Sequence, residues 1–428
     1  MSVEPSAVTA PPAELVARLD GYFADEPAWH RAQRLEALAH YDALPVPERQ
    51  RTPLKGRRLE SIPYLERRRG DVPEDARENA TVLLTPGGVA DIKLSPALSE
   101  AHVVVLDLAE ALHRYPDLVR DVLGQVQADA EDRYTALNRA FWHPGLFCYV
   151  PPGAELTEPI TIVHWIDEAS PGYLPRVAVL ADEGSRATVV ETLLGSPADT
   201  HRMLVSEVLE VHARPASRVT VASIQQLPPG AEAFVRRRAQ VERDAQVDWH
   251  TGEFGAALSV AGHASLLHGA GSSMSSVTVF YGTRTQHQDY TAEVVHQAPH
   301  TRSNILARGV MGDRARSIFT GQSVILKGAV GTDARQKEQT LMLSDEARAD
   351  AIPSLKIDDN DVFAAHSASA GPVDPTVLYY LESRGLDPQE ARRVVIRGFL
   401  EPVLASLAPS SVQERVRGLV EGKLGGGS

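Results

Sequence analysis

The chain has 428 residues, of which 43% are hydrophobic, and it carries a formal net charge of −13. This apolar share is typical of a globular protein with a buried core, while the acidic balance disfavours nucleic-acid binding, which depends on basic surface. No apolar run approaches the roughly 20 residues that span a bilayer, and the N-terminus lacks the basic and apolar regions of a secretion signal. We therefore expect a cytoplasmic protein without a membrane-spanning segment.

Residues 1–140 are predicted to form a mostly helical N-terminal region. Apolar residues recur at helical spacing within 12–43, where a proline separates two segments, and again within 108–126 and 130–139. The stretch 51–70 is basic and contains prolines. We interpret it as a solvated linker, because charge runs are usually exposed.

Between residues 141 and 371 the sequence changes to short β-branched and aliphatic runs that end in turn residues. These runs include LFCYV, ITIVHWI, RVAVLA, ATVVETLL, VSEVLEVHA, RVTVASI, AFVRRRAQV, SVTVFYG, NILARGV and SIFTGQSVIL. A doubly wound sheet is excluded, because its crossover helices are missing. The strand pattern by itself leaves two architectures open, a parallel β-helix and a pair of β-sandwiches.

Residues 372–424 return to a helical pattern. An Asp-Pro pair, which supplies an N-cap and a proline at the first helical position, begins each of two predicted helices. The first helix should end at Gly385, and Pro402 should kink the second. The ending GGGS, residues 425–428, is predicted to be a flexible tail.

Cys148 is the only cysteine of the chain. The chain can therefore form no internal disulfide and no multi-thiolate metal site. Because the surrounding run LFCYV is apolar, we expect this cysteine in the core.

Three histidines lie close together in sequence and could ligate zinc or iron with Asp289. They are His287, His296 and His300. The alternative is a hydrogen-bonded turn network, which we favour because no metalloprotease-type helix accompanies them.

Two acidic clusters, SDEARAD at 344–350 and DDND at 358–361, resemble the paired carboxylates of β-helix enzymes that cleave polysaccharides. Asp and Asn are also the ordinary residues of a turn. Aromatic residues make up only 6% of the chain, which disfavours a sugar-stacking groove. We therefore favour turns over a catalytic site.

His366 lies among small residues in the stretch FAAHSASAG. A lone histidine on a strand is more often a core or turn residue than a ligand. Small neighbours nevertheless permit close approach of another surface, and an imidazole nitrogen suits iron or zinc. One nitrogen cannot hold a metal, so other ligands would have to come from another chain.

Several phrases match a known family. They are APHTRSNILARGV, SIFTGQSVILKGA, TDARQ, LMLSDEARAD, IPSLKI, AHSAS and YYLESRGLDPQEARRVVIRGF, with weaker matches in ALNRAFWHPGLFCYVPPG and LPVP. On these phrases the chain resembles the SufB/SufD family of iron–sulfur cluster assembly proteins, and in particular its SufD branch. The resemblance implies a mainly β protein, with a right-handed parallel β-helix core between helical N- and C-terminal regions.

The resemblance also implies a function. Such a chain would be a non-catalytic scaffold that pairs with a SufB-like subunit through its β-helix, or with itself when isolated. It would carry a transient iron–sulfur cluster, shared with that partner, to which His366 contributes a ligand; flavin binding is left open. The SufC ABC-type ATPase would bind the C-terminal helices, where the implied docking residues are Tyr380, Arg384, Gly385, Arg397 and Phe399. The alternative for each of these residues is that the helices form an amphipathic pair packed as a cap on the end of the solenoid.

Two departures from the family pattern limit the role of this chain. The SufD pattern often has a cysteine two residues before the histidine, where this chain has Ala364, and the sulfur-accepting cysteine of the SufB branch is missing from 336–343. This chain therefore cannot accept sulfur and can add at most a nitrogen ligand. The rival functions are a purely structural partner without cluster contact and a carbohydrate-active β-helix enzyme.

Overall fold

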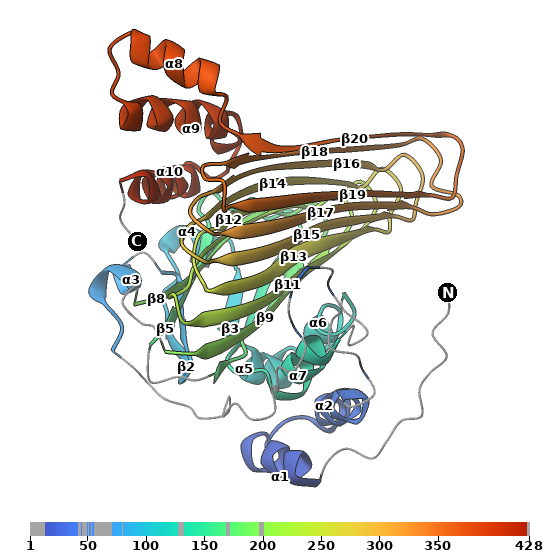
Figure 1. The fold of residues 1–428 in the computed structure, drawn as a ribbon. Coiled ribbons are helices and arrows are strands. Elements are labelled where there is room, and N and C mark those ends of the chain that lie inside the picture. The colour runs from blue at the N-terminus through green and yellow to red at the C-terminus, as the bar shows by residue number, and fades with distance from the viewer. Residues whose placement is uncertain are drawn as a thin grey trace.

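The computed structural model describes residues 13–41, 44, 49, 51–52, 54, 71–78, 80–126, 132–167, 172–196 and 201–425. Most of the predicted linker at 51–70 and the last three residues of the predicted tail lie outside the described residues. The centre of the molecule is a column of stacked strands, with helices at its sides (Figure 1).

Two sheets form the column, and each contains 10 strands. Sheet A consists, in spatial order, of β2 (Gly88–Ile92), β1 (Val82–Thr85), β5 (Ile160–Ile166), β8 (Arg186–Gly195), β10 (Arg218–Gln226), β12 (Gln246–Glu253), β14 (Ser273–Gly282), β16 (Arg302–Met311), β18 (Thr332–Met342) and β20 (Val362–Pro372). Sheet B consists of β19 (Arg348–Ile357), β17 (Arg316–Ile325), β15 (His287–His296), β13 (Leu258–Leu267), β11 (Ala231–Val241), β9 (Met203–Ala213), β7 (Arg176–Ala181), β4 (Gly145–Val150) and β3 (Val104–Asp107), with β6 (Gly172–Tyr173) beside β9.

Successive strands from β7 onward alternate between the two sheets, and almost all neighbours within a sheet are parallel. Each coil therefore repeats the position of the coil before it. In sheet A, one column of directly paired residues consists of Arg186, Arg218, Gln246, Ser273 and Arg302. This architecture is the parallel β-helix, which confirms one of the two predicted alternatives and excludes the sandwich pair.

The space between the sheets is filled mainly by apolar side chains. It contains stacked rings, with 6.2 Å between the centroids of Phe280 and Phe319 and 5.9 Å between those of Tyr290 and Phe319. Gly309 makes room for this stack, because a Cβ atom there would lie 1.8 Å from Phe280. Close packing of this kind is expected where the apolar residues of successive strands form one continuous buried column.

The helices of the N-terminal region pack mainly on sheet B, and one of them packs on β5 of sheet A. These helices are α1 (Ala13–Tyr22), α2 (Ala28–Tyr41), α3 (Glu74–Glu78), α4 (Pro96–Glu100), α5 (Leu108–Arg114), α6 (Pro116–Arg120) and α7 (Arg133–Phe141). Helices α1, α2 and α7 share one apolar cluster with β9, β11 and β13, in which the rings of Tyr134 and Phe234 stack with centroids 3.6 Å apart. The helices predicted within 12–43, 108–126 and 130–139 are confirmed, whereas β1, β2 and β3 were not predicted.

Of the three C-terminal helices, the last two pack on sheet A and the first packs against the second. They are α8 (Pro375–Ser383), α9 (Pro388–Leu404) and α10 (Ser410–Leu424). As predicted, Asp374 and Asp387 cap α8 and α9, and Gly385 ends α8 with a φ of +98°. Helix α9 continues through Pro402 in its last turn, and α10 was not predicted. Within the described residues, no helix is long and apolar enough to cross a membrane.

Candidate functional site

The two ends of the β-helix differ. Near its first strands, α5 and α6 pack on β4 and β7. At the other end, β19 pairs only with β17 and β20 pairs only with β18 among the described residues. Two large apolar side chains are exposed there, Ile357 and Phe363, the latter to 53%. We call β19, β20 and these two side chains the open end; it is the upper edge of the column in Figure 1.

His366 lies on β20 at the open end. It pairs directly with Gln336 of β18, and Glu338 lies two residues further along that strand. Gln336 and Glu338 point into the column and are 7% and 5% exposed. Paired residues of parallel strands share a face, so His366 belongs to the same inward row. It is exposed because no further coil covers β20 in the described chain.

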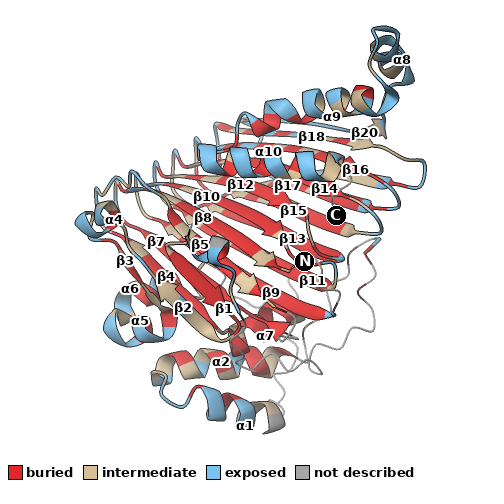
Figure 2. Ribbon diagram, turned by 90° about the vertical axis from the view of Figure 1, so that its left-hand side faces the viewer, coloured by how far each residue is buried: buried red, intermediate tan, exposed pale blue. Residues whose placement is uncertain are grey.

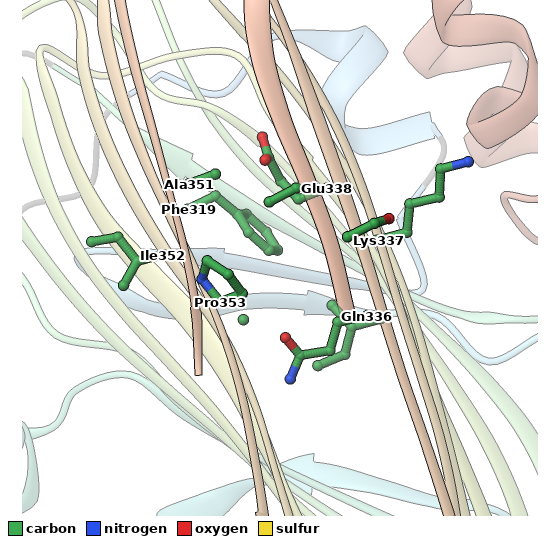
Figure 3. A pocket seen from close by; sticks show the side chains of 11 residues that line it. Phe319, Gln336, Lys337, Glu338, Ala351, Ile352 and Pro353 are labelled. Carbon is green, nitrogen blue, oxygen red and sulfur yellow. The ribbon is translucent and has the colours of Figure 1, made fainter. Parts of the chain in front are cut away.

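A small cavity lies beside Gln336 and Glu338 of this row (Figure 3). Its volume of about 10 Å³ suits a single water molecule. Phe319, Gln336 and Glu338 line it together with Ser367 and Ala368, the residues that follow His366. Burial raises the pKa of Glu338 to about 7. The end of the column therefore contains polar groups that approach β20 from inside.

The neighbours of His366 leave its ring accessible. Ala365, Ser367 and Ala368 are exposed, so only small side chains surround the imidazole on its own strand. Cys148 lies in β4 and is fully buried, which raises the pKa of its thiol to about 12. The prediction that this cysteine belongs to the core is confirmed. A second ligand of thiol type at the open end would have to come from another chain.

The three clustered histidines do not converge. His287 and Asp289 both hydrogen-bond the hydroxyl of Thr52, at 3.0 and 2.5 Å, while His296 is buried between the hydroxyls of Thr301 and Ser303, at 2.8 and 2.9 Å. In the chain segments that the structure describes, no group of His, Cys, Asp and Glu side chains is placed to hold a metal ion. The hydrogen-bonding alternative is therefore confirmed for His287 and His296.

The acidic stretch 358–361 forms a turn, as predicted. The carboxylate of Asp359 accepts hydrogen bonds from the backbone N–H groups of Gly328 and Asp361, at 3.0 and 3.2 Å. In the other stretch, Asp350 forms an ion pair with Arg51. The carboxylates of Asp359 and Asp350 therefore form structural contacts within the chain.

The implied docking residues fall into two groups. Tyr380 is exposed on α8, and the guanidinium of Arg384 lies 5.1 Å from its ring, directly before Gly385. Arg397 is engaged within the chain, because its Nε and Nη2 atoms donate to Glu421 of α10 at 2.7 Å. Phe399 also packs against other residues of this chain.

Phe399 lies between α9 and sheet A. It is partly buried in the cluster that joins these elements, and Arg308 of β16 places its guanidinium 5.1 Å from the ring. The exposed group of docking residues is thus confined to α8 and the turn after it.

Helix α8 contains no buried residue (Figure 2). Its exposed apolar surface consists of Val377, Tyr379 and Tyr380, and Tyr379 is 74% exposed. Tyr379 was not among the predicted docking residues, although the pair of adjacent tyrosines in VLYYLESRG was a signal for it. A helix that exposes three such side chains is typical of an interaction surface.

The interior of the β-helix holds a charged cluster that the sequence did not reveal. Arg237 is fully buried, and its guanidinium lies 3.5 Å from Glu191, 3.7 Å from Glu207 and 3.9 Å from Glu253. Burial and the charge of Glu191 hold the pKa of Glu207 well above its ordinary value. Burial also raises the pKa of Glu253 to about 7.

We expect Glu253→Gln to change the pH dependence of stability. The folded chain binds a proton at Glu253 up to a pH of about 7, whereas the unfolded carboxyl loses it near 4.5. The native protein therefore loses stability relative to the variant as pH rises through this window, by about 3 kcal/mol at ~1.4 kcal/mol per pKa unit. Gln225 and Ser259 can still donate to the new amide oxygen. Urea unfolding of both proteins from pH 4.5 to 7.5 measures the difference, and parallel curves would contradict the prediction.

Comparison with known proteins gives a consistent result. Residues 164–399 match the model of the SUF system FeS cluster assembly SufBD core domain, and residues 79–162 match that of the SufBD protein N-terminal region. The chain is 32% identical to the iron-sulfur cluster assembly protein SufD of Bacillus subtilis over 421 residues, which cover 93% of this chain and 95% of that protein. It is 25% identical to the iron-sulfur cluster assembly protein SufB of the same organism over 405 residues, 90% of this chain and 87% of that protein.

A third relative is the iron-sulfur cluster assembly SufBD family protein of Staphylococcus epidermidis. It is 26% identical over 405 residues, 90% of this chain and 87% of the relative. The matched segments contain the whole β-helix up to α9, including His366 and the open end. The chain belongs to the SufBD family of iron–sulfur cluster assembly proteins, and within that family it is SufD-like.

Proposed function

We propose that this chain is a non-catalytic scaffold subunit that pairs with a SufB-like relative through its open end. The support is the pair of strands β19 and β20, which have no neighbour on one side within the described part of the chain and expose Ile357 and Phe363. Unpaired strand edges attract further strands. A relative with the same fold presents matching strands, so a joint β-helix would bury both edges.

The second part of the proposal concerns the SufC ATPase, which docks on α8 and the turn after it. The supporting features are the exposed Val377, Tyr379 and Tyr380 and the neighbouring guanidinium of Arg384. Aromatic residues and arginine are enriched where binding energy is concentrated. Because α9 and α10 are packed on sheet A, α8 projects from a fixed base.

The third part concerns the cluster, which is cargo of the assembly and not a resident group. His366 contributes one imidazole nitrogen at the seam between the subunits, and the partner contributes the thiolate ligands that this chain lacks. The observation that carries the proposal is the position of His366, which belongs to an inward-facing row and yet is exposed at the open end. A docked partner would enclose the ring.

Two variants test the proposal, and each serves as the control of the other. Phe363→Asp places a charge on the open end, and we expect it to weaken capture of the SufB-like relative about tenfold or more while the ATPase is retained. Tyr379→Ala with Tyr380→Ala removes the exposed rings of α8, and we expect an equal loss of ATPase capture while the relative is retained. Co-purification of the tagged full-length chain with both partners measures both effects.

The two arms also separate the parts of the proposal. All three residues are exposed, so the variants should unfold at the same temperature as the native chain. Retention of the relative by Phe363→Asp would contradict pairing through the open end. Retention of the ATPase by the double tyrosine variant would contradict docking on α8.

A further inference from the structure

A cleft of about 750 Å³ lies at the first residues of β15, β17 and β19 in sheet B, and neither α8 nor His366 lines it. Its volume lies within the range of small-molecule sites. Ile318 contributes to its floor, and polar side chains surround it. These polar side chains are Arg51, His287, Arg316, Asp345, Arg348 and Asp350.

The basic side chains of the cleft follow from the register of the β-helix. His287, Arg316 and Arg348 are the first residues of β15, β17 and β19, and they pair directly with one another. Neighbouring strands lie about 4.8 Å apart, so the two guanidiniums leave adjacent backbone positions on the same face. Like charges at such positions are destabilising.

Among the described residues, no acidic side chain forms an ion pair with either of these two arginines. Arg316 and Arg348 are exposed and form no ion pair or side-chain hydrogen bond with the rest of the described chain. Asp350 is engaged by Arg51, and Asp289, the next carboxylate on this face, is engaged by Arg49 at 2.7 Å. Asp345, on the turn before β19, is the remaining carboxylate that lines the cleft. The cleft therefore has this one carboxylate for the two guanidiniums of Arg316 and Arg348.

A comparable pair elsewhere in the column is treated differently. Arg186 and Arg218 are paired on adjacent strands of sheet A, and Arg186 forms an ion pair with Glu155 at 3.4 Å. The fold thus supplies a carboxylate partner to one arginine pair and leaves the other pair free at the edge of a cleft. An anion bound in the cleft would remove the repulsion between Arg316 and Arg348.

We propose that this cleft binds a small phosphate-bearing molecule between Arg316 and Arg348. The planar guanidinium offers two parallel N–H donors to a phosphate, which makes arginine the preferred residue for such groups. Two adjacent guanidiniums match a ligand with two linked phosphate groups. Arg348 is the first residue of β19, so the cleft borders the open end, although neither α8 nor His366 lines it.

Binding of inorganic pyrophosphate to the full-length chain, measured by calorimetry, tests this site. We expect saturable binding that weakens with added salt, and we expect Arg316→Gln with Arg348→Gln to weaken it about tenfold or more. The matched control is Arg302→Gln, because Arg302 is likewise an exposed first residue of a strand, β16 in sheet A. This control should bind like the native chain.

Three results would overturn the proposal. The first is the absence of pyrophosphate binding to the native chain at millimolar concentration, and the second is equal binding by the native chain and the double variant. The third is equal affinity for succinate, because a site that takes any dianion equally is not built for phosphate. Circular dichroism of each variant verifies that the β-helix is intact, so that a loss of binding reports on the cleft.

Discussion

Replacing His366 by alanine is expected to lower the cluster yield of the assembled complex about tenfold or more, the usual scale for a lost contribution to a metal site. The fold and the assembly should remain intact, because the side chain is exposed. Iron and acid-labile sulfide in the reconstituted complex, together with its visible absorbance, measure the yield.

The control for this experiment is Ser369→Ala, an exposed position three residues further along β20. It should give the yield of the native complex. An unchanged yield for His366→Ala would favour the rival function, in which the chain holds its partners in place without touching the cluster. Loss of the partner from the His366→Ala complex would instead assign the histidine to the interface itself.

Replacing Arg237 by leucine is expected to lower the free energy of unfolding by about 3–5 kcal/mol, the cost of removing one partner from a buried ionic cluster. The leucine leaves Glu191 and Glu253 inside the column without their cation. Arg237 also donates a 2.6 Å hydrogen bond to the hydroxyl of Ser223, which would lose its donor. The shift of the urea midpoint at pH 7 measures the effect.

Glu207→Gln is the matched control within the same cluster. Burial and the charge of Glu191 keep Glu207 protonated, so a neutral amide replaces a neutral carboxyl. We expect a change of about 1 kcal/mol or less, as for other substitutions that conserve shape and charge. A cost for Glu207→Gln as large as that for Arg237→Leu would show that the packing of the interior, and not its charge, determines the stability there.

The buried cluster around Arg237 also shows how the interior of the β-helix accommodates ionisable groups. Arg237 pairs along sheet B with Leu209 and His263 on the neighbouring strands, so an arginine occupies a row that is otherwise apolar or aromatic. Burial lowers the pKa of His263 to about 3, which keeps this ring neutral. The column therefore contains few net charges although its interior includes several ionisable groups.

Local sequence signals predicted the local structure well. The Asp-Pro pairs before α8 and α9 predicted both N-caps, and Gly385 predicted the end of α8, because these features depend only on a few neighbouring residues. The apolar setting of Cys148 predicted its burial for the same reason. The strands β12, β13, β15 and β18 were harder to recognise, because polar and small residues interrupt their apolar pattern.

Long-range pairing decided the features that local signals could not. Strands β1 and β3 are short and lie in a helical region, yet they extend both sheets through partners in β5 and β4. The separation of Arg397 and Phe399 from Tyr380 depends on where α10 and β16 pack. The residues of α10 and β16 are distant in sequence from these positions.

The sequence by itself determined the family, the alternation of helical and strand regions, and His366 as a candidate ligand, because these rest on residue identity and short-range pattern. Only the tertiary structure decided that His366 faces inward at an uncovered end, that Arg237 meets three glutamates, and that Arg316 and Arg348 stand side by side. Each of these features depends on the register between coils, which places residues about thirty positions apart side by side. Hydrogen bonds between backbone groups set this register, and backbone groups are the same for every residue type, so the local sequence does not reveal it.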